Sequence, residues 1–216
     1  KAYYMNDRTG AAALLEEAIN TGGVDPKVRA QLKLDLGDVY LFDANIWEAS
    51  LLYSQVDLDF KNDILGHEAR LRNAEVSFYS GDFLWSKAQL DVLKASTSKL
   101  IANDAMELSL LITDNLGDDS TRTPLTQFSR ARLLSFQHRY DEALLTMDSL
   151  NIDFPLNSLG DEILYERFHI AYARHQYDTA ATFLEKVLEL YPTDILVDNA
   201  LLDLGKLYQE KLNNKV

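Results

Sequence analysis

The residues best suited to chemistry in this chain are its four histidines, His67, His138, His169 and His175. A zinc site needs ligands that converge on one ion, such as an i, i+4 pair of histidines with a further carboxylate or thiolate. His169 and His175 are six residues apart, a spacing that does not place them on one helical face. His138 and His175 are 37 residues apart, and we interpret them as one position in two copies of a repeat. The histidines therefore predict no metal site.

Paired carboxylates are the second candidates for chemistry, because two neighbouring acids can act as general acid and general base. That role needs one member to be buried, so that its pKa rises. The pairs Glu16-Glu17 and Asp118-Asp119 lie in polar stretches, which favours a solvated surface. The chain also has no Cys, no phosphate-binding Gly-x-x-x-x-Gly-Lys-Ser/Thr loop and no Gly-x-Ser-x-Gly nucleophile elbow. The sequence therefore predicts no enzyme activity and no cofactor.

Charge and hydropathy limit the kinds of partner. The 216 residues are 47% hydrophobic, and 34 acidic against 21 basic residues give a net charge of −13. An acidic surface repels phosphate backbones, so we expect no nucleic-acid partner. No apolar run approaches the ~20 residues that cross a bilayer, so we expect no direct membrane insertion. The chain begins with Lys1 rather than Met, and we expect it to be a piece of a longer protein.

A pattern that recurs every 37 residues indicates the elements that carry these side chains. Each copy reads as a first helix (helix A), a three-residue turn and a second helix (helix B). The pattern predicts repeats at residues 30–63, 67–100, 124–157 and 161–194. Small residues at the eighth position of a copy, Gly37, Ala74, Ala131 and Gly205, predict a close crossing of helix A and helix B. A bulky replacement at Gly205 is therefore expected to lower thermal stability.

The pattern is interrupted once. The second and third copies start 57 residues apart, which leaves room for an extra helix near residues 104–115. Asp104 followed by Glu107 resembles a capping box at the start of this helix. The polar run 116–122 comes next, and we expect a hinge or a change of superhelix direction there.

The pattern is incomplete at both ends. Residues 1–23 read as a partial repeat with helix B only, and residues 198–212 as a partial repeat with helix A only. The predicted fold is all-α. It is a single α-α superhelix (solenoid) of stacked helix-turn-helix units over residues 1–216, with the one extra helix near residues 104–115.

The repeat resembles a known family. Leu36-Gly37-x-x-Tyr40, then Ala49, and a proline after helix B such as Pro155 or Pro192, is similar to the tetratricopeptide repeat (TPR). The segment from Leu190 to Tyr208 resembles the repeats of bacterial envelope-type TPR proteins. This resemblance implies a periplasmic or outer-membrane-associated protein, with the cytoplasm as the alternative.

In the family, helix A lines a concave groove that receives a peptide or partner helix. The resemblance implies that an apolar and aromatic floor, with charge passing from acidic to basic along the array, lies in this groove. The alternative is that these side chains pack against the neighbouring unit. The predicted groove residues are Leu34, Asp38, Phe42, Leu71, Glu75, Phe78, Tyr79, Phe128, Arg132, Phe136, Tyr165, His169, Tyr172 and Lys206.

We therefore expect a non-enzymatic scaffold or adaptor for a protein or peptide partner. Two alternatives remain: a recruiting or regulatory arm of a larger enzyme or envelope complex, and self-association through the terminal helices. Alanine at both Phe128 and Tyr165 is expected to weaken partner capture without loss of helicity. Trp47 and Trp85, near the start of helix B in successive repeats, are expected to wedge adjacent units together.

Overall fold

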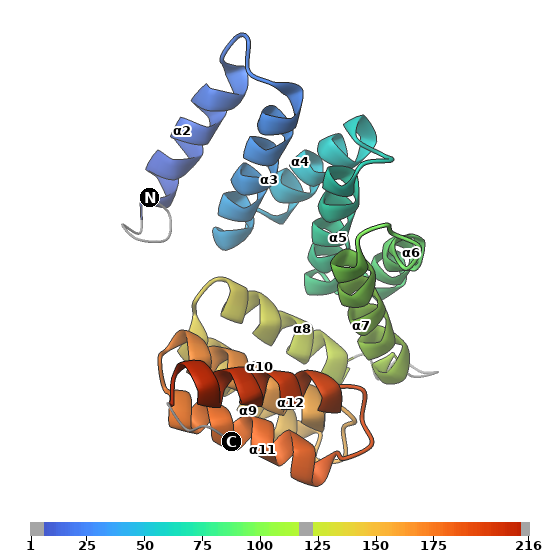
Figure 1. The fold of residues 1–216 in the computed structure, drawn as a ribbon, viewed down its shortest axis with the longest axis vertical. Helices are drawn as coiled ribbons and strands as arrows, with labels where there is room; N and C mark the ends of the chain where they lie inside the picture. The colour runs from blue at the N-terminus through green and yellow to red at the C-terminus, as the bar shows by residue number, and fades with distance from the viewer. Residues whose placement is uncertain (1–6, 117–122, 213–216) are drawn as a thin grey trace. The chain divides into compact units, whose positions relative to one another are not determined.

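The structure is a computed structural model that describes residues 7–116 and 123–212. Within these ranges the chain is all-helical and has no strand, which confirms the predicted fold class (Figure 1). The helices are α2 (Arg8–Asn20), α3 (Pro26–Phe42), α4 (Ile46–Asp59), α5 (Ile64–Tyr79), α6 (Phe83–Leu93), α7 (Lys99–Asn115), α8 (Thr123–Phe136), α9 (Tyr140–Asp153), α10 (Gly160–Ala173), α11 (Tyr177–Leu190) and α12 (Val197–Glu210).

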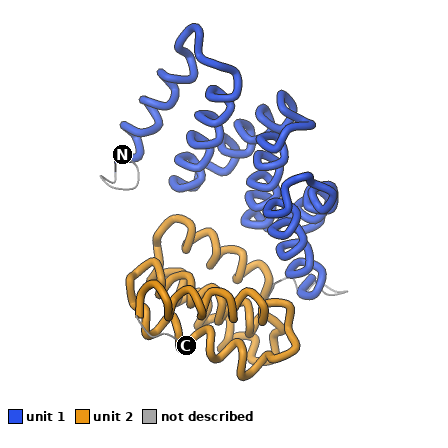
Figure 2. The backbone as a smooth tube through the Cα atoms, viewed as in Figure 1, with its two compact units in different colours: residues 1–118 blue, residues 119–216 orange. Residues whose placement is uncertain are grey.

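The chain divides into two compact units, residues 1–118 (unit 1) and residues 119–216 (unit 2) (Figure 2). The single array predicted for residues 1–216 is thus built as two units, and each is described below by itself. The predicted hinge segment 116–122 lies, from residue 117 onward, outside the described residues.

Unit 1 is a stack in which each helix packs against the next along the chain. Helix α5 also packs against α3, and α7 also packs against α5. In this arrangement α3 and α5 are helices A, while α4 and α6 are helices B. The extra helix α7 therefore occupies the place of a further helix A, which explains why the alternation of A and B restarts after it.

Helix α7 begins earlier than the sequence indicates. It starts at Lys99, and the Ser98 hydroxyl caps it by accepting a hydrogen bond from the Ile101 amide (3.5 Å). Asp104 and Glu107 lie inside the helix, so the predicted capping box is wrong. The helix forms earlier because Ile101 and Ala105 are buried and extend its packed face toward the N-terminus.

Unit 2 repeats the same plan with α8, α10 and α12 as helices A and α9 and α11 as helices B. The helices B of both units begin at Ile46, Phe83, Tyr140 and Tyr177, with the intervals of 37, 57 and 37 residues that the sequence predicts. The core around α10, α11 and α12 is formed by Phe168, Ala171, Ala180, Ala181, Leu184, Val187, Leu196, Ala200 and Leu207.

A common turn joins helix A to helix B in each complete repeat. Its middle residue is Ala44, Gly81, His138 or His175, with φ between 58° and 79°. The residue after it donates its amide to a carbonyl five residues back, as from Asn45 to Tyr40 (2.9 Å). This is the Schellman ending of a helix, and it leaves His138 and His175 as exposed turn residues.

The predicted close crossing is present at Gly37 and absent at Gly205. A Cβ atom at Gly37 would lie 2.3 Å from Cε1 of Tyr53, which is fully buried. A Cβ atom at Gly205 would meet nothing within 4 Å, because none of the described helices crosses that face of α12. The expectation that a larger residue at Gly205 destabilises the chain is therefore wrong.

Candidate partner-binding surface

Three of the predicted groove residues are buried. Leu34 and Phe78 of unit 1 expose 0% of their surface, and Phe128 of unit 2 exposes 1%. They offer no surface to a partner, so we correct their assignment from groove to interior. Phe128→Ala is therefore unsuitable as a test of binding. Truncating a buried phenylalanine costs about 3–5 kcal/mol of stability, so the variant would lose folding as well as any binding.

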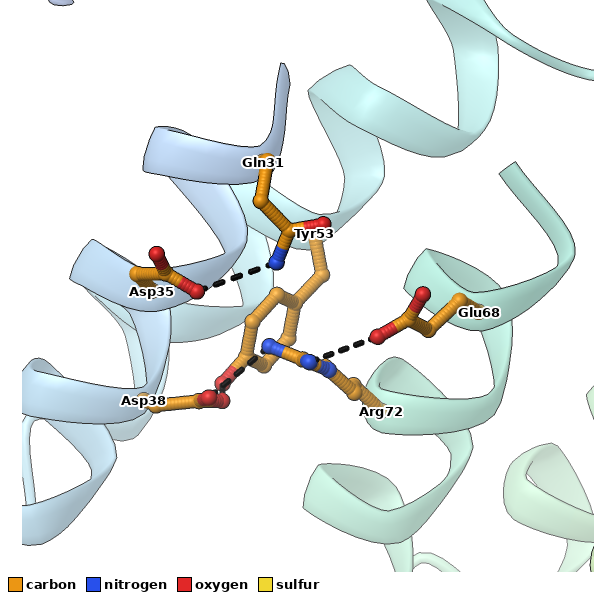
Figure 3. A network of polar contacts seen from close by, with 6 residues as sticks. All are labelled: Gln31, Asp35, Asp38, Tyr53, Glu68 and Arg72. Carbon is orange, nitrogen blue, oxygen red and sulfur yellow. Dashed lines mark hydrogen bonds and ion pairs between the residues drawn. The ribbon is translucent and has the colours of Figure 1, made fainter. Parts of the chain in front are cut away.

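In unit 1, the predicted groove residue Asp38 belongs to a polar network that links three helices (Figure 3). Its carboxylate accepts hydrogen bonds from the Tyr53 hydroxyl (2.7 Å) and from the Arg72 guanidinium (2.8 Å). Arg72 also donates to Glu68 (2.7 Å). Burial and the charge of Asp38 raise the pKa of Tyr53 above its usual range. Asp38 thus ties α3 to α4 and α5, which is a structural role.

The other unit 1 candidates are half-buried. Leu71, Glu75 and Tyr79 lie on α5, and Phe42 lies at the end of α3. The Arg8 guanidinium carbon stands 5.1 Å from the centre of the Phe42 ring, so the chain itself covers part of this ring. These residues leave unit 1 with little free aromatic surface on this face.

In unit 2, the predicted residues Tyr165, His169 and Tyr172 join Phe168 in a continuous aromatic row along α10. The ring of His169 lies 4.8 Å, centre to centre, from both Tyr165 and Phe168, and Phe168 lies 6.1 Å from Tyr172. The Tyr165 hydroxyl donates to Asp203 of α12 (2.6 Å) and holds the two helices A together. His169 and Tyr172 remain exposed, so this row presents aromatic surface.

A pocket of about 220 Å³ opens between α10 and α12, and we call it the α10–α12 pocket. It brings together three of the predicted groove residues: His169 and Lys206, at the ninth position of their copies, and Tyr172, at the twelfth. The whole lining is Phe168, His169, Tyr172, Asp203, Lys206, Leu207 and Glu210.

Four of these lining residues, Phe168, Asp203, Leu207 and Glu210, were missed by sequence reasoning. Glu210 stands at the thirteenth position of its copy, so the same positional rule extended to the last partial repeat would have found it. Asp203 carries no such signal, because its place in the pocket follows from its bond to Tyr165.

The predicted change from acidic to basic charge does not survive as free charge. Asp38 is paired with Arg72, as above. Arg132 lies 3.6 Å from Glu166, and Lys206 lies 3.4 Å from Asp203. Each of these three predicted charges therefore has an ion-pair partner within its own unit. The remaining candidate, Phe136, is half-buried at the end of α8.

Trp47 and Trp85 do not pack between adjacent repeats. They expose 84% and 58% of their surface on helices B of unit 1. The prediction was wrong because these positions lie on the outer side of helix B, whereas the inner side carries the small residues Ala49 and Ser86.

In the described part of the chain, no group of three or more His, Asp or Glu side chains could hold a metal ion. None of the described helices has the length and apolar character needed to cross a membrane. No protein-family model matches the chain, and no curated protein matches it either. The chain's own residues therefore carry the functional argument.

Proposed function

We propose that this chain is a TPR-type, non-enzymatic adaptor that captures an extended peptide segment of a partner protein in the α10–α12 pocket. The exposed rings of His169 and Tyr172 on α10, which line one pocket with Lys206 and Glu210 of α12, are the observation that carries the proposal. The 37-residue recurrence of helices B and the shared turn support the TPR assignment.

The size of the pocket favours a single side chain as its occupant. Sites for cofactors and drug-sized ligands hold about 300–1,000 Å³, whereas this pocket holds about 220 Å³. A large apolar or aromatic side chain would fill it between Phe168, Tyr172 and Leu207. Aromatic anchors of this kind supply most of the binding energy of peptide interfaces.

The charges at the pocket favour a basic residue beside this anchor. Asp203 and Glu210 carry two negative charges against one positive charge on Lys206, and the whole chain carries −13. Opposite charge on the partner would raise its association rate and select its register. The ligand that fits is therefore an extended segment with an aromatic or aliphatic anchor next to Lys or Arg.

A displayed library of random peptides, selected on the whole chain, tests this function. We expect the selected peptides to share the anchor and the basic neighbour. Tyr172→Ser should weaken their binding at least ~10-fold, since it removes an exposed aromatic wall. Glu210→Lys should shift the selection toward acidic peptides.

Leu156→Ser is the matched control. Leu156 exposes 98% of its surface in unit 2 and does not line the pocket, so its replacement should leave binding unchanged. Equal binding by wild type and Tyr172→Ser would refute the pocket as the binding site.

The α12 face around Gly205 favours a second candidate function, self-association through a terminal helix. Leu201 and Leu202 expose 54% and 59% of their surface there, and Gly205 has open space above it. A helix from another copy could cross at this glycine as α4 crosses α3 at Gly37. Leu201→Glu should abolish such association while leaving peptide capture intact.

A further inference from the structure

The start of α3 and the end of α4 border a pocket of about 320 Å³ in unit 1, and we call it the α3–α4 pocket. Because α3 and α4 form an antiparallel pair, the start of one lies beside the end of the other. The lining residues are Pro26, Arg29, Ala30, Lys33, Asp59 and Phe60. The α10–α12 pocket lies in the other unit and shares none of them, so a ligand here is independent of the proposed peptide capture.

Two cations line this pocket with one acid between them. Arg29 and Lys33 are four residues apart on α3, a spacing that places both on one side of the helix. The Lys33 side chain exposes only 19% of its surface, and its ammonium lies 3.9 Å from Asp59, too far for a hydrogen bond. None of the other described residues forms an ion pair with either cation. Both therefore lack a close anionic partner.

The guanidinium of Arg29 has unused hydrogen-bonding capacity. Its Nη2 donates to the Thr21 carbonyl at 3.3 Å, longer than is usual for such a bond. Its Nε is buried and has no hydrogen-bond partner among the described residues, which is costly for a charged donor. Arg70 in the same unit shows the contrast, because its Nε and Nη2 both donate to the carboxylate of Asp57, at 3.0 and 2.9 Å. A carboxylate is thus a group that completes such an edge.

The backbone amides at the start of α3 do not form this site. The Asp25 carboxylate already accepts hydrogen bonds from the amides of Lys27 and Val28, at 2.9 and 3.3 Å. Neither of these two residues lines the pocket. The side chains of Arg29 and Lys33 are therefore the groups that can hold an anion there.

We propose that the α3–α4 pocket binds a small organic monocarboxylate. The guanidinium of Arg29 turns away from its long bond to Thr21 and presents Nε and Nη2 to the carboxylate. The ammonium of Lys33 donates a further hydrogen bond to the same group. An anion bound in this way gives both cations the close partner that they otherwise lack.

The charge and size of the pocket select this class of ligand. Arg29 and Lys33 against Asp59 leave one net positive charge, which a monocarboxylate neutralises. A phosphate dianion would leave one negative charge uncompensated beside Asp59. The volume of about 320 Å³ lies at the lower end of the range for small-ligand sites, about 300–1,000 Å³. The apolar body of the ligand lies against Pro26 and Ala30.

Nuclear magnetic resonance of the ¹⁵N-labelled whole chain tests the proposal, with benzoate as the probe and the Nε–H signal of Arg29 as the readout. Loss of this signal in Arg29→Lys assigns it. We expect the signal to shift and to saturate as benzoate is added. Benzamide, the neutral analogue, should leave it in place. Phenyl phosphate, a dianion at about pH 7.5, should bind more weakly than benzoate.

Variants separate the contributions of the lining, and the backbone amide signal of Ala30 gives the affinity in each. Arg29→Lys keeps the charge but loses the planar edge, and should weaken benzoate binding at least ~10-fold. Asp59→Asn removes the competing carboxylate at an exposed position, and should tighten binding about 3-fold. Arg130→Lys, at an exposed position of α8 in unit 2, is the matched control and should leave the affinity unchanged.

Four results would overturn the proposal. The Arg29 signal might stay still with benzoate, or move equally with benzamide. Asp59→Asn might bind benzoate no more tightly than the wild type. Phenyl phosphate might bind more tightly than benzoate, which would make the pocket a phosphate site. A capped peptide with one central glutamate might bind more tightly than benzoate, and the carboxylate would then come from a partner protein rather than a free ligand.

Discussion

Alanine substitution at Gly37 and at Gly205 should change stability in opposite directions, although both glycines occupy the eighth position of a repeat. Replacing glycine by alanine inside a helix stabilises it by about 1 kcal/mol. At Gly205 no other atom opposes this gain, because a Cβ atom there meets nothing within 4 Å. Gly205→Ala should therefore stabilise unit 2 by about 0.5–1 kcal/mol.

At Gly37 the same gain is outweighed. The new Cβ atom would lie 2.3 Å from Cε1 of Tyr53, whose ring is fully buried and whose hydroxyl is bonded to Asp38 at 2.7 Å. The ring cannot move without losing that bond, which contributes about 1 kcal/mol, and overpacking a core costs about 1–3 kcal/mol. Gly37→Ala should therefore destabilise unit 1 by about 1–3 kcal/mol net.

Differential scanning calorimetry with far-UV circular dichroism measures both effects. For a unit of this size, 1 kcal/mol shifts Tm by about 4–8 °C. The upward Tm shift of unit 2 in Gly205→Ala and the downward Tm shift of unit 1 in Gly37→Ala should therefore differ by roughly 10 °C or more. Both tryptophans lie in unit 1, so their fluorescence follows the unfolding of unit 1 alone. The transition seen by fluorescence is therefore that of unit 1, and the remaining one is that of unit 2.

A compensating variant tests the cause. In the next repeat, Ala74 and Leu90 stand 37 residues after Gly37 and Tyr53, and both are fully buried. Tyr53→Leu should therefore recover part of the loss in Gly37→Ala, a coupling that two independent sites would not show. A neutral or stabilising Gly37→Ala, or a destabilising Gly205→Ala, would refute the assignment of open and closed crossings.

Two further predictions concern the helix starts. Ser98→Ala should destabilise unit 1 by about 1 kcal/mol in urea unfolding, because it removes the N-cap of α7. Asp104→Ala should be neutral or stabilising, because Asp104 lies inside the helix. The reverse ranking of the two variants would move the start of α7 to residue 104. Burial raises the pKa of Asp161 in α10, and neighbouring Asp194 raises it further, so the folded state holds a proton at a pH where the unfolded chain has lost it. Ionised Asp161 therefore costs stability at neutral pH, and this cost disappears as the pH falls through its folded pKa toward the ordinary aspartate range. Asp161→Asn should be more stable than wild type near pH 7, with the advantage shrinking toward about pH 4 in urea titrations; an advantage independent of pH would contradict this origin.

The parts of the fold that follow from local rules could be predicted from the sequence. The helices that start at Ile46, Phe83, Tyr140 and Tyr177 each follow a short turn, and the turn is formed by hydrogen bonds between residues at most five apart in the sequence. The crossing at Gly37 was predictable because only a small residue lets two helices approach so closely. The start of α7 was not, because Ser98 and Asp104 are both good caps and the choice between them depends on which turn of helix is buried.

The candidate site was predicted less completely. His169, Tyr172 and Lys206 meet in the α10–α12 pocket as the positional rule expects, but Phe128 obeys the same rule and is buried. A residue's place on its helix follows from periodicity, whereas its exposure depends on how large its neighbours on the next helix are. The outward direction of Trp47 and Trp85 was missed for the same reason.

By itself the sequence determined the all-α class, the alternation of helices A and B and the interruption near α7, since these depend on residues close together along the chain. Only the tertiary structure decided which small residues are crossed, which charges are neutralised and which aromatic side chains remain exposed. Those outcomes depend on pairs such as Asp38 with Arg72 and Tyr165 with Asp203, which lie 34 and 38 residues apart. Such pairs form only when two repeats stack, because stacking sets the distance and the loss of water between their side chains.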